Sequence, residues 1–400
     1  MKKRRENNFK IVIVILFLII SKFLVAEEVS VSLFHDRKIQ GITLTVQKGS
    51  YIVFDGKKIV DTLEIGTNIT VIKESDYLVY RNRSKAFASD QDLVIVNRGE
   101  ASFFLNYTGS VEPAKNFEGW LRIKRTSGFI YVINYIELDQ YIAGIIEAER
   151  GTLASEEYYK AIAVILRTSI FLNLGKHKSE GFDFCDSRHC YLYKNRAGSR
   201  LILQAAKKTN KQVIVDNSLN MINPVYHINS GGLTTDGSVL GISSDYLQPV
   251  VDTFAIYGQS YQWKLLIPGA EWQQYLVRKG IKSAQSKLFK DLLIDQKNTR
   301  LISYKLGNDN LKVDDVRNDL NWNSAFFSMS IDKSGVITVN GRGNGHGVGL
   351  SLESAFNMAA KGYKYEQILY YFYKNTKVVS CNSLLIYSQL ERELKNEKPL

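Results

Sequence analysis

The segment WLRIKRTSGFIYVINYIELDQYIAGIIEAER, residues Trp120–Arg150, changes its hydrophobic period part-way along. Its first part alternates apolar and polar residues on both sides of a Ser-Gly turn, which predicts a β-hairpin. From Leu138 to Glu149 the apolar residues recur at spacings of three and four, which predicts a helix. A chain that carries hairpins first and helices afterwards is typical of an α+β fold.

The sequence around this segment predicts the organisation of the remaining chain. Residues 27–115 contain short alternating runs broken by Gly-Lys and Asp-Gly turns, which indicates a β-rich N-terminal region. Residues 116–377 mix helical and strand patterns, and residues 378–400 form a charged tail. Further helices are expected over Glu156–Leu174, Arg200–Asn210, Leu350–Lys361 and Tyr365–Tyr373. A polar amphipathic stretch, Trp272–Gln296, predicts a helical excursion on the surface at about residues 262–300.

The N-terminus, MKKRRENNFKIVIVILFLIISKFLVA (residues 1–26), has a basic cluster followed by an apolar run, as export signals do. The apolar run is shorter than the roughly 20 residues that span a bilayer. Because Lys22 can snorkel to the interface and let Phe23–Ala26 add length, an uncleaved anchor is favoured over cleavage near Ala26. The remaining chain is therefore expected outside the cytoplasm, membrane-anchored or secreted to the periplasm or cell wall.

The charge balance favours an acidic partner. The chain has 52 Lys and Arg residues against 40 Asp and Glu residues, a formal net charge of +12. An exported protein works away from nucleic acid, so the cell wall or the membrane surface is the expected partner. A lysine-rich genome would produce the same excess.

A second stretch, GRGNGHGVG (Gly341–Gly349), places glycine at every second position around His346. It fits neither the G-x-G-x-x-G frame nor a P-loop, so we expect no nucleotide and no organic cofactor. Glycine allows positive φ and lets the backbone approach a ligand closely. The loop is therefore the wall of a binding site, or else a tight bend whose histidine caps a strand.

Two acids near the end of the predicted helix compete for a catalytic role. Glu147 and Glu149 lie two residues apart, so they do not share a helix face. Glu149 follows Ile142, Ile145 and Ile146 at helical spacing, which places its carboxyl over apolar neighbours. Burial raises a carboxyl pKa, and a general acid must hold its proton near neutral pH. These arguments favour Glu149, although a surface residue near a helix end would show the same pattern.

The stretch HKSEGFDFCDSRHCYLY contains four candidate metal ligands: His177, Cys185, His189 and Cys190. Two thiolates and two imidazoles would make a closed tetrahedral zinc site, which suits a structural role because no position is left for water. The residues alone leave two alternatives open, a Cys185–Cys190 disulfide and an unligated cluster.

The glycine-rich stretch and its continuation, GRGNGHGVGLSLESAFNMAAKGYKYEQILYYFYKNTKV, resemble the C-terminal motif of the stage II sporulation protein D family. FEGWLRIKRTSGFIYVINYIELDQYIAGIIEAE, FDFCDSRHCYLY and VYHINSGGLTTD are similar to further blocks of that family, in the same order. The resemblance covers about residues 117–377. The sequence departs from the motif at Leu352, Glu353 and Ser354, where Gln, an aromatic residue and Gly are usual.

The resemblance implies a role for each set of residues. It places the catalytic glutamate at Glu149 and favours a structural Zn²⁺ on His177, Cys185, His189 and Cys190. It also implies that the mixed core carries a glycan cleft. The residues expected to bind substrate there are His227, Ser230, Gly232, Thr234, Arg342, Gly345, His346 and Ser351.

The activity that the resemblance implies is lytic cleavage of peptidoglycan between MurNAc and GlcNAc. One glutamate suffices because the muramyl C6 hydroxyl can replace water and close a 1,6-anhydro ring. The expected substrate is a denuded glycan strand, whose free lactyl carboxylates suit a basic protein. Two alternatives remain: a non-catalytic, glycan-binding enhancer of a cell-wall amidase, and a zinc-stabilised glycan-binding module.

Overall fold

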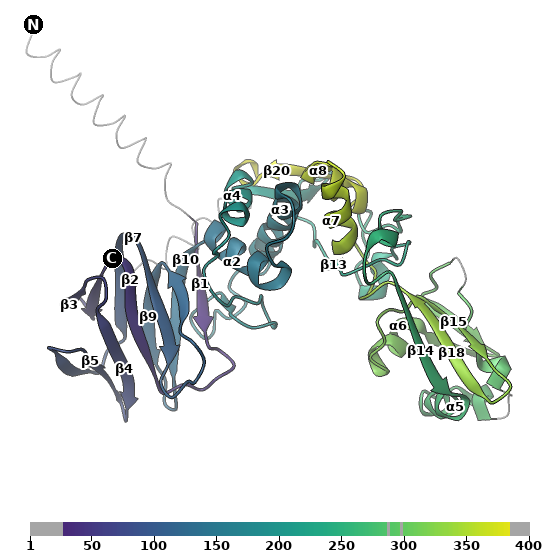
Figure 1. The fold of residues 1–400 in the computed structure, drawn as a ribbon, viewed down its shortest axis with the longest axis horizontal. Coiled ribbons are helices and arrows are strands. Elements are labelled where there is room, and N and C mark those ends of the chain that lie inside the picture. Colours follow the sequence, from purple (N-terminus) through teal and green to yellow (C-terminus); the bar gives the residue numbers. More distant parts are fainter. Residues whose placement is uncertain (1–26, 286–288, 297–298, 385–400) are drawn as a thin grey trace, which may run out of the picture. The chain divides into compact units, whose positions relative to one another are not determined.

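The computed structural model describes residues 27–285, 289–296 and 299–384, and they form two compact units (Figure 1). Among described residues, the first unit comprises 27–150 and 173–199, and the second comprises 151–172 and 200–384. The predicted export segment, 1–26, lies outside the described residues, as does most of the predicted tail. No helix in the described part of the chain is long and apolar enough to cross a bilayer.

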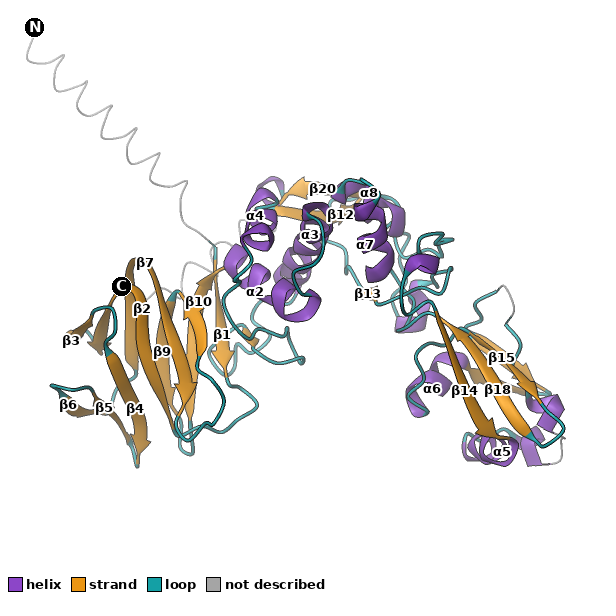
Figure 2. Cartoon of the chain, in the orientation of Figure 1, coloured by secondary structure: helices purple, strands orange, loops and turns teal. Residues whose placement is uncertain are grey.

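The first unit is built on one 11-stranded sheet, drawn in orange in Figure 2. Its strands are β1 (Glu28–Leu33), β2 (Gly41–Asp55), β3 (Lys58–Leu63), β4 (Asn68–Glu74), β5 (Tyr77–Arg81), β6 (Ala86–Ser89), β7 (Leu93–Tyr107), β8 (Lys115–Glu118), β9 (Trp120–Arg125), β10 (Ile130–Glu137) and β11 (Phe184–Cys185). The order is β11-β1-β10-β9-β7-β2-β4-β5-β6, with β3 beside β2 and β8 beside β7. This sheet confirms the expected β-rich N-terminal part.

The change of period in the segment Trp120–Arg150 corresponds to a change of secondary structure. β9 and β10 pair antiparallel as the predicted hairpin, and α2 (Leu138–Arg150) begins directly after β10. Ile142, Ile145 and Ile146 of α2 are fully buried. The helical spacing of the apolar residues therefore identified the face of α2 that packs into the core.

The second unit contains the helices predicted downstream. Its elements here are α3 (Glu156–Leu172), α4 (Arg200–Lys208), β12 (Gln212–Asp216), α7 (Leu352–Ala360), α8 (Tyr365–Phe372) and β20 (Thr376–Ser380). α3 contacts α4, β12, α7 and α8, and β12 pairs antiparallel with β20. Most of the α3 side chains are buried, so α3 is the central helix of this part. Together the two units confirm the α+β fold class.

The predicted helical excursion has a different structure. Its elements are β14 (Gln262–Pro268), α5 (Gly269–Arg278), β15 (Ser303–Leu306), β16 (Asp309–Lys312), α6 (Val313–Asp319), β17 (Phe327–Ile331) and β18 (Val336–Arg342). The prediction of one helix over Trp272–Gln296 was wrong, because α5 ends before Gly280, whose φ is +79°, and the described residues from there to Gln296 form no helix other than 3₁₀ turns. Trp272 is 1% exposed and belongs to a hydrophobic core that includes Val339 of β18. The region is thus a packed layer over the β14-β18-β17 sheet, not a surface excursion.

The packing of α2 against the segment after the His-Cys cluster can be tested at Gly144. A Cβ at this position would lie 2.4 Å from the Tyr193 ring and 2.8 Å from the Asn195 carbonyl oxygen. We expect Gly144→Ala to lower the free energy of unfolding by at least about 1 kcal/mol, since overpacking outweighs the helix propensity gained. Urea unfolding would measure the change.

Gly128→Ala provides the matched control, because no atom lies within 4 Å of a Cβ there and the position does not require positive φ. We expect this variant to stay within about 0.5 kcal/mol of the wild type. Equal stability of the two variants would contradict the account of Gly144.

Candidate functional site

Glu149 lies near the end of α2, at the edge of its buried face. Its side chain is 21% exposed. Its Oε1 accepts a hydrogen bond from the Leu192 N–H at 3.2 Å, and its Oε2 lies 3.1 Å from an Arg150 guanidinium nitrogen. The carboxylate is therefore held in place from two sides.

Glu147 has a different environment, although it lies only two residues away. Its Oε1 accepts from the Gly198 N–H at 3.1 Å and its Oε2 accepts from the Ser199 N–H at 2.7 Å. These bonds fasten the segment ending at Ser199 to α2. Both oxygens of Glu147 thus bond to backbone amides, which indicates a structural role.

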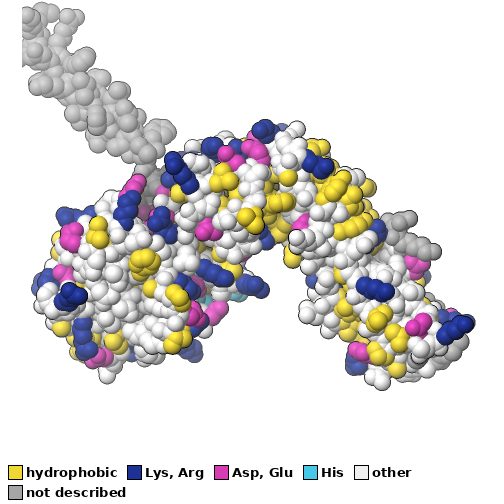
Figure 3. Space-filling model, viewed as in Figure 1, with side chains coloured by type: hydrophobic (Ala, Val, Ile, Leu, Met, Phe, Trp, Pro, Cys, Tyr) yellow, Lys and Arg dark blue, Asp and Glu magenta, His cyan; other side chains and the backbone are white. Residues whose placement is uncertain are grey.

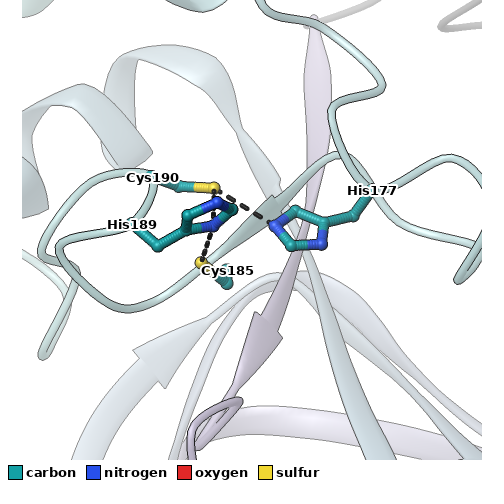
Figure 4. A group of neighbouring side chains, drawn as sticks. All are labelled: His177, Cys185, His189 and Cys190. Carbon is teal, nitrogen blue, oxygen red and sulfur yellow. Dashed lines mark hydrogen bonds between the residues drawn. The ribbon is translucent and has the colours of Figure 1, made fainter.

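The four candidate metal ligands converge from β11 and the loops around it (Figure 4). Their ligand atoms all lie within 4.8 Å of one another. The Sγ–N separations are 3.4 Å for Cys190–His177, 3.6 Å for Cys185–His189 and 3.7 Å for Cys190–His189. A tetrahedral zinc ion with ordinary Zn–S and Zn–N bonds places sulfur and nitrogen about 3.5 Å apart. The cluster therefore fits a closed four-ligand metal site.

The two cysteines of the cluster are free thiols in this structure, so the Cys185–Cys190 disulfide alternative gains no support. The hydrogen bond from Cys190 lowers the pKa of Cys185 to about 3. The same contact, together with burial, raises the pKa of Cys190. The thiolate is the form of cysteine that binds a metal, and the lowered pKa of Cys185 favours that form.

The loops that carry the cluster are fastened to the sheet and to α2. β11 pairs in parallel with β1, with Cys185 opposite Ser32. Next to it, the Asp183 carboxylate accepts hydrogen bonds from the Ser30 backbone N–H at 2.9 Å and its hydroxyl at 2.6 Å. On the other side of the cluster, Leu192 follows Cys190 by two residues and donates its N–H to Glu149.

The glycine-rich loop lies in the second unit, and four of its five alternate glycines have a positive φ. The φ angles are +80° at Gly343, +101° at Gly345, +78° at Gly347 and +70° at Gly349. A Cβ on Gly347 would also lie 2.1 Å from the guanidinium of Arg300. Glycine is thus required both by the backbone conformation and by a close neighbour.

The two predicted substrate-binding histidines bond to the backbone of this loop and its neighbour. His346 donates from Nε2 to the Tyr226 carbonyl at 3.0 Å and accepts at Nδ1 from the Val348 N–H at 3.1 Å. His227 Nδ1 lies 3.0 Å from the Val348 carbonyl oxygen. Burial lowers the pKa of His346 to about 4 and that of His227 well below its usual range. Both imidazoles are therefore neutral at neutral pH.

These bonds join the short strands β13 (Tyr226–His227) and β19 (Leu350–Ser351), which pair in parallel. The hydrogen bonds of His346 match the interpretation of a tight bend whose histidine ties down a strand. A contact between His346 and glycan stays a prediction.

The predicted hydroxyl residues are buried in hydrogen bonds that join separate loops. The Ser230 hydroxyl donates to Asp252 Oδ2 at 2.6 Å, and the Ser354 hydroxyl donates to the same oxygen at 2.7 Å. Ser351 in turn donates to the Ser354 hydroxyl at 2.9 Å. Thr234 accepts from the Val250 N–H at 2.7 Å. The hydroxyls thus shape the loops around Asp252.

The remaining predicted substrate-binding residues are Gly232, Gly345 and Arg342. Gly232 has a φ of +98°, and its carbonyl accepts from the Asp252 N–H. Gly345 lies against His227, because a Cβ on this glycine would be only 2.9 Å from the His227 Cβ. The Arg342 guanidinium stacks over the Phe326 ring at 4.1 Å. All the predicted substrate-binding residues lie in the second unit, whereas Glu149 and the metal ligands lie in the first.

Two residues that the sequence analysis missed organise these loops, Arg300 and Asp252. Arg300 is 9% exposed and donates to the carbonyls of Ser230, Leu233 and His346. Burial raises the pKa of the Asp252 carboxyl, which accepts the two serine hydroxyls. Asp252 lies about twenty residues after Ser230-Gly231-Gly232, so the sequence could have suggested it as a partner of that segment. No motif around Arg300 indicates its role.

Comparison with known proteins agrees with the resemblance. Residues 126–215 match the SpoIID family model, which is described as Stage II sporulation protein. The match includes α2 with Glu149 and all four residues of the His-Cys cluster, and it ends before His227 and the glycine-rich loop.

Two of the similar proteins carry the name of this family. Stage II sporulation protein D of Bacillus subtilis (strain 168) is 27% identical over 271 residues, which cover 63% of this chain and 77% of that protein. Stage II sporulation protein D of Bacillus amyloliquefaciens is 24% identical over 279 residues, 66% of this chain and 79% of that protein. An uncharacterized protein of Brachyspira hyodysenteriae is 23% identical over 257 residues, 63% of this chain and 69% of that protein. The expected SpoIID resemblance is confirmed.

The partial burial of the His346 ring predicts how the stability of the fold depends on pH. A histidine whose folded pKa is lowered stabilises the fold above its unfolded pKa of about 6.5, and this contribution is lost as pH falls towards the folded value. We therefore expect the free energy of unfolding to fall between about pH 6.5 and the His346 pKa of about 4. NMR titration of the His346 ring, assigned by its absence in His346→Gln, should give a midpoint near pH 4. A midpoint near 6.5 would contradict the burial argument.

Proposed function

We propose that this protein is a peptidoglycan lytic transglycosylase with Glu149 as its acid and base. The observation that carries the proposal is the difference between two neighbouring carboxylates. Both acids lie within the SpoIID match, but both oxygens of Glu147 accept from the Gly198 and Ser199 amides, whereas Glu149 accepts one amide, from Leu192, and its other oxygen faces Arg150. Glu149 is thus the better candidate for the proton transfer that glycan cleavage requires.

The proposed reaction needs one carboxyl group. Protonated Glu149 donates its proton to the glycosidic oxygen between MurNAc C1 and GlcNAc, and the C1–O bond breaks. The resulting carboxylate then takes the proton of the muramyl C6 hydroxyl as O6 bonds to C1, which yields 1,6-anhydroMurNAc without consuming water. An intramolecular nucleophile is favoured because it is already held near C1. Arg150, 3.1 Å from Glu149, can stabilise the carboxylate between the two steps.

The proposed substrate is a denuded glycan strand, which carries free carboxylates. The net charge of +12 supports an anionic partner. On the face in Figure 3, Lys and Arg side chains are scattered over each unit, which suits general attraction to a polyanion more than one specific basic patch. We further propose an extracytoplasmic location, with the N-terminal segment as export signal or anchor, and glycan binding by the loops that carry His227, Ser230 and His346.

The His-Cys cluster is proposed to hold a structural Zn²⁺. His177, Cys185, His189 and Cys190 would fill four positions, so the ion would have no open position for water or substrate. When bound, zinc would link the loops on both sides of β11. Since Leu192 follows Cys190 by two residues, the ion would also steady the N–H that Glu149 accepts.

A second candidate function is that of a glycan-binding enhancer of a cell-wall amidase. It is favoured by the departures from the family motif at two positions. Leu352 is 6% exposed and offers no polar group, and the Glu353 carboxylate accepts from Asn229 at 2.7 Å and from the Ser260 hydroxyl at 2.9 Å. Glu353 therefore holds loops together rather than facing a ligand.

Glu149→Gln tests the proposed chemistry. We expect it to reduce formation of anhydro-muramyl products from denuded glycan strands by about 10²–10⁴-fold, because glutamine cannot transfer the proton. Mass spectrometry of the products would measure the change. The control is Glu147→Gln, the same substitution two residues away, which should keep most of the activity.

Undiminished activity in Glu149→Gln would refute the assignment of the acid. Strands retained by the wild type without cleavage would instead support the enhancer. Binding of the strands should be measured in parallel by co-sedimentation, so that loss of binding is distinguished from loss of chemistry.

The metal can be tested on untreated protein. Elemental analysis should find about one zinc per chain, and Cys190→Ser should lose most of it because a thiolate ligand is replaced. Chelation should also lower the melting temperature, since a metal that binds the folded state stabilises it. Protein with no metal and an intact Cys185–Cys190 bridge would contradict the zinc site.

A further inference from the structure

The second ring nitrogen of His177 points to a residue outside the four-ligand set. Its Nε2 lies 3.4 Å from Cys190 Sγ, whereas its Nδ1 lies 2.6 Å from Glu180 Oε1. A neutral imidazole carries one N–H, and a carboxylate only accepts. The proton therefore resides on Nδ1, which leaves the Nε2 lone pair directed into the cluster.

Glu180 is itself held by β9 and β10, the two strands of the Trp120–Arg150 segment. The Tyr131 hydroxyl of β10 donates to Glu180 Oε2 at 2.7 Å, and Lys124 Nζ of β9 donates to the Glu180 backbone carbonyl at 2.8 Å. Tyr131 and Lys124 face each other across the β9–β10 ladder. The sheet thus fixes the carboxylate from both its side chain and its backbone.

The His177 ring is also clamped by packing. It is 7% exposed and stacks on Phe182, with ring centroids 5.0 Å apart and an interplanar angle of 25°. His35 meets it edge-on at 5.1 Å. Packing and the hydrogen bond to Glu180 therefore both orient the His177 ring.

We propose that Glu180 is the positioning residue of the metal site: it fixes the tautomer and direction of His177, and Tyr131 holds Glu180. The inference rests on the metal binding proposed above. Carboxylates that accept from a metal-bound histidine orient the ring and raise its basicity, and their loss typically weakens metal binding about 10–100-fold.

The arrangement divides the site into two halves. His177 and Cys185 form the half that Glu180, Phe182 and β1 preorganise on the sheet. His189 and Cys190 form the half that leads to Leu192 and Glu149. A bound metal would link the second half to the sheet. Because Glu180 sets the metal affinity, it would also determine how firmly this link holds.

The test measures zinc affinity of the full chain by competition with a chromophoric chelator. Glu180→Gln keeps the size of the side chain but removes its charge, and we expect about 10–100-fold weaker binding. Tyr131→Phe removes only the hydroxyl that holds Glu180, so a smaller loss is expected. Glu100→Gln is the matched control, because the Glu100 side chain is 90% exposed and pairs with Lys48 on the sheet. The zinc affinity of this variant should equal that of the wild type.

Two further readouts separate orientation from folding. The ¹⁵N shifts of His177 in the metal-free wild type should show protonation at Nδ1, and Glu180→Gln should lose this preference. Circular dichroism of the metal-free variants should match the wild type, and Tyr131→Phe carries the test if Glu180→Gln fails to fold. Wild-type protein without zinc affinity would overturn the metal site together with the inference. Wild-type affinity in both Glu180→Gln and Tyr131→Phe would overturn the inference alone.

Discussion

The hydrogen bond from the Leu192 N–H to Glu149 is the contact on which the arrangement of the first unit's site depends. It joins a helix that carries the candidate acid to the loop that carries Cys190. That loop continues back through the His-Cys cluster to β11, which pairs with β1 of the large sheet. A single hydrogen bond between residues 43 apart in sequence thus connects the position of one carboxylate to the loop of the His-Cys cluster and, through β11, to the sheet.

In the second unit, the loops are organised by the Asp252 carboxylate and also by groups that the first unit's site does not use in this way. There, a buried cation and neutral imidazoles bond to backbone carbonyls, because left-handed glycines bring those carbonyls close together. Arg300 donates to three of them, His346 accepts from the Val348 N–H, and the His227 ring lies against the Val348 carbonyl oxygen. The two units share a principle, since in both of them buried polar side chains fix loop backbones that no regular ladder supports.

Sequence periodicity was sufficient for the features set by near neighbours. It identified the β9–β10 hairpin, α2 and the different faces of Glu147 and Glu149, and close spacing identified the His-Cys cluster. It failed where partners are distant in sequence. Arg300 bonds to residues near position 230. The helix expected over Trp272–Gln296 ends before Gly280, and its apolar residues share a core with β17 and β18, which come much later in the chain. The hydrogen bonds of His227 and His346 to the backbone could not be predicted from the sequence either, because a residue's type does not identify its backbone partner.

The place of β1 in the sheet has a consequence for how the protein acquires its structure. β1 is made first, yet both of its neighbours come later: β10 about a hundred residues on, and β11 after the chain has passed through α3 of the second unit. The Ser30–Asp183 bond closes a loop of 153 residues. Contacts of such separation are slow to form, and an unpaired strand is prone to pair with other chains. We therefore expect that β1 must be kept from pairing with other chains until β10 and β11 have been synthesised.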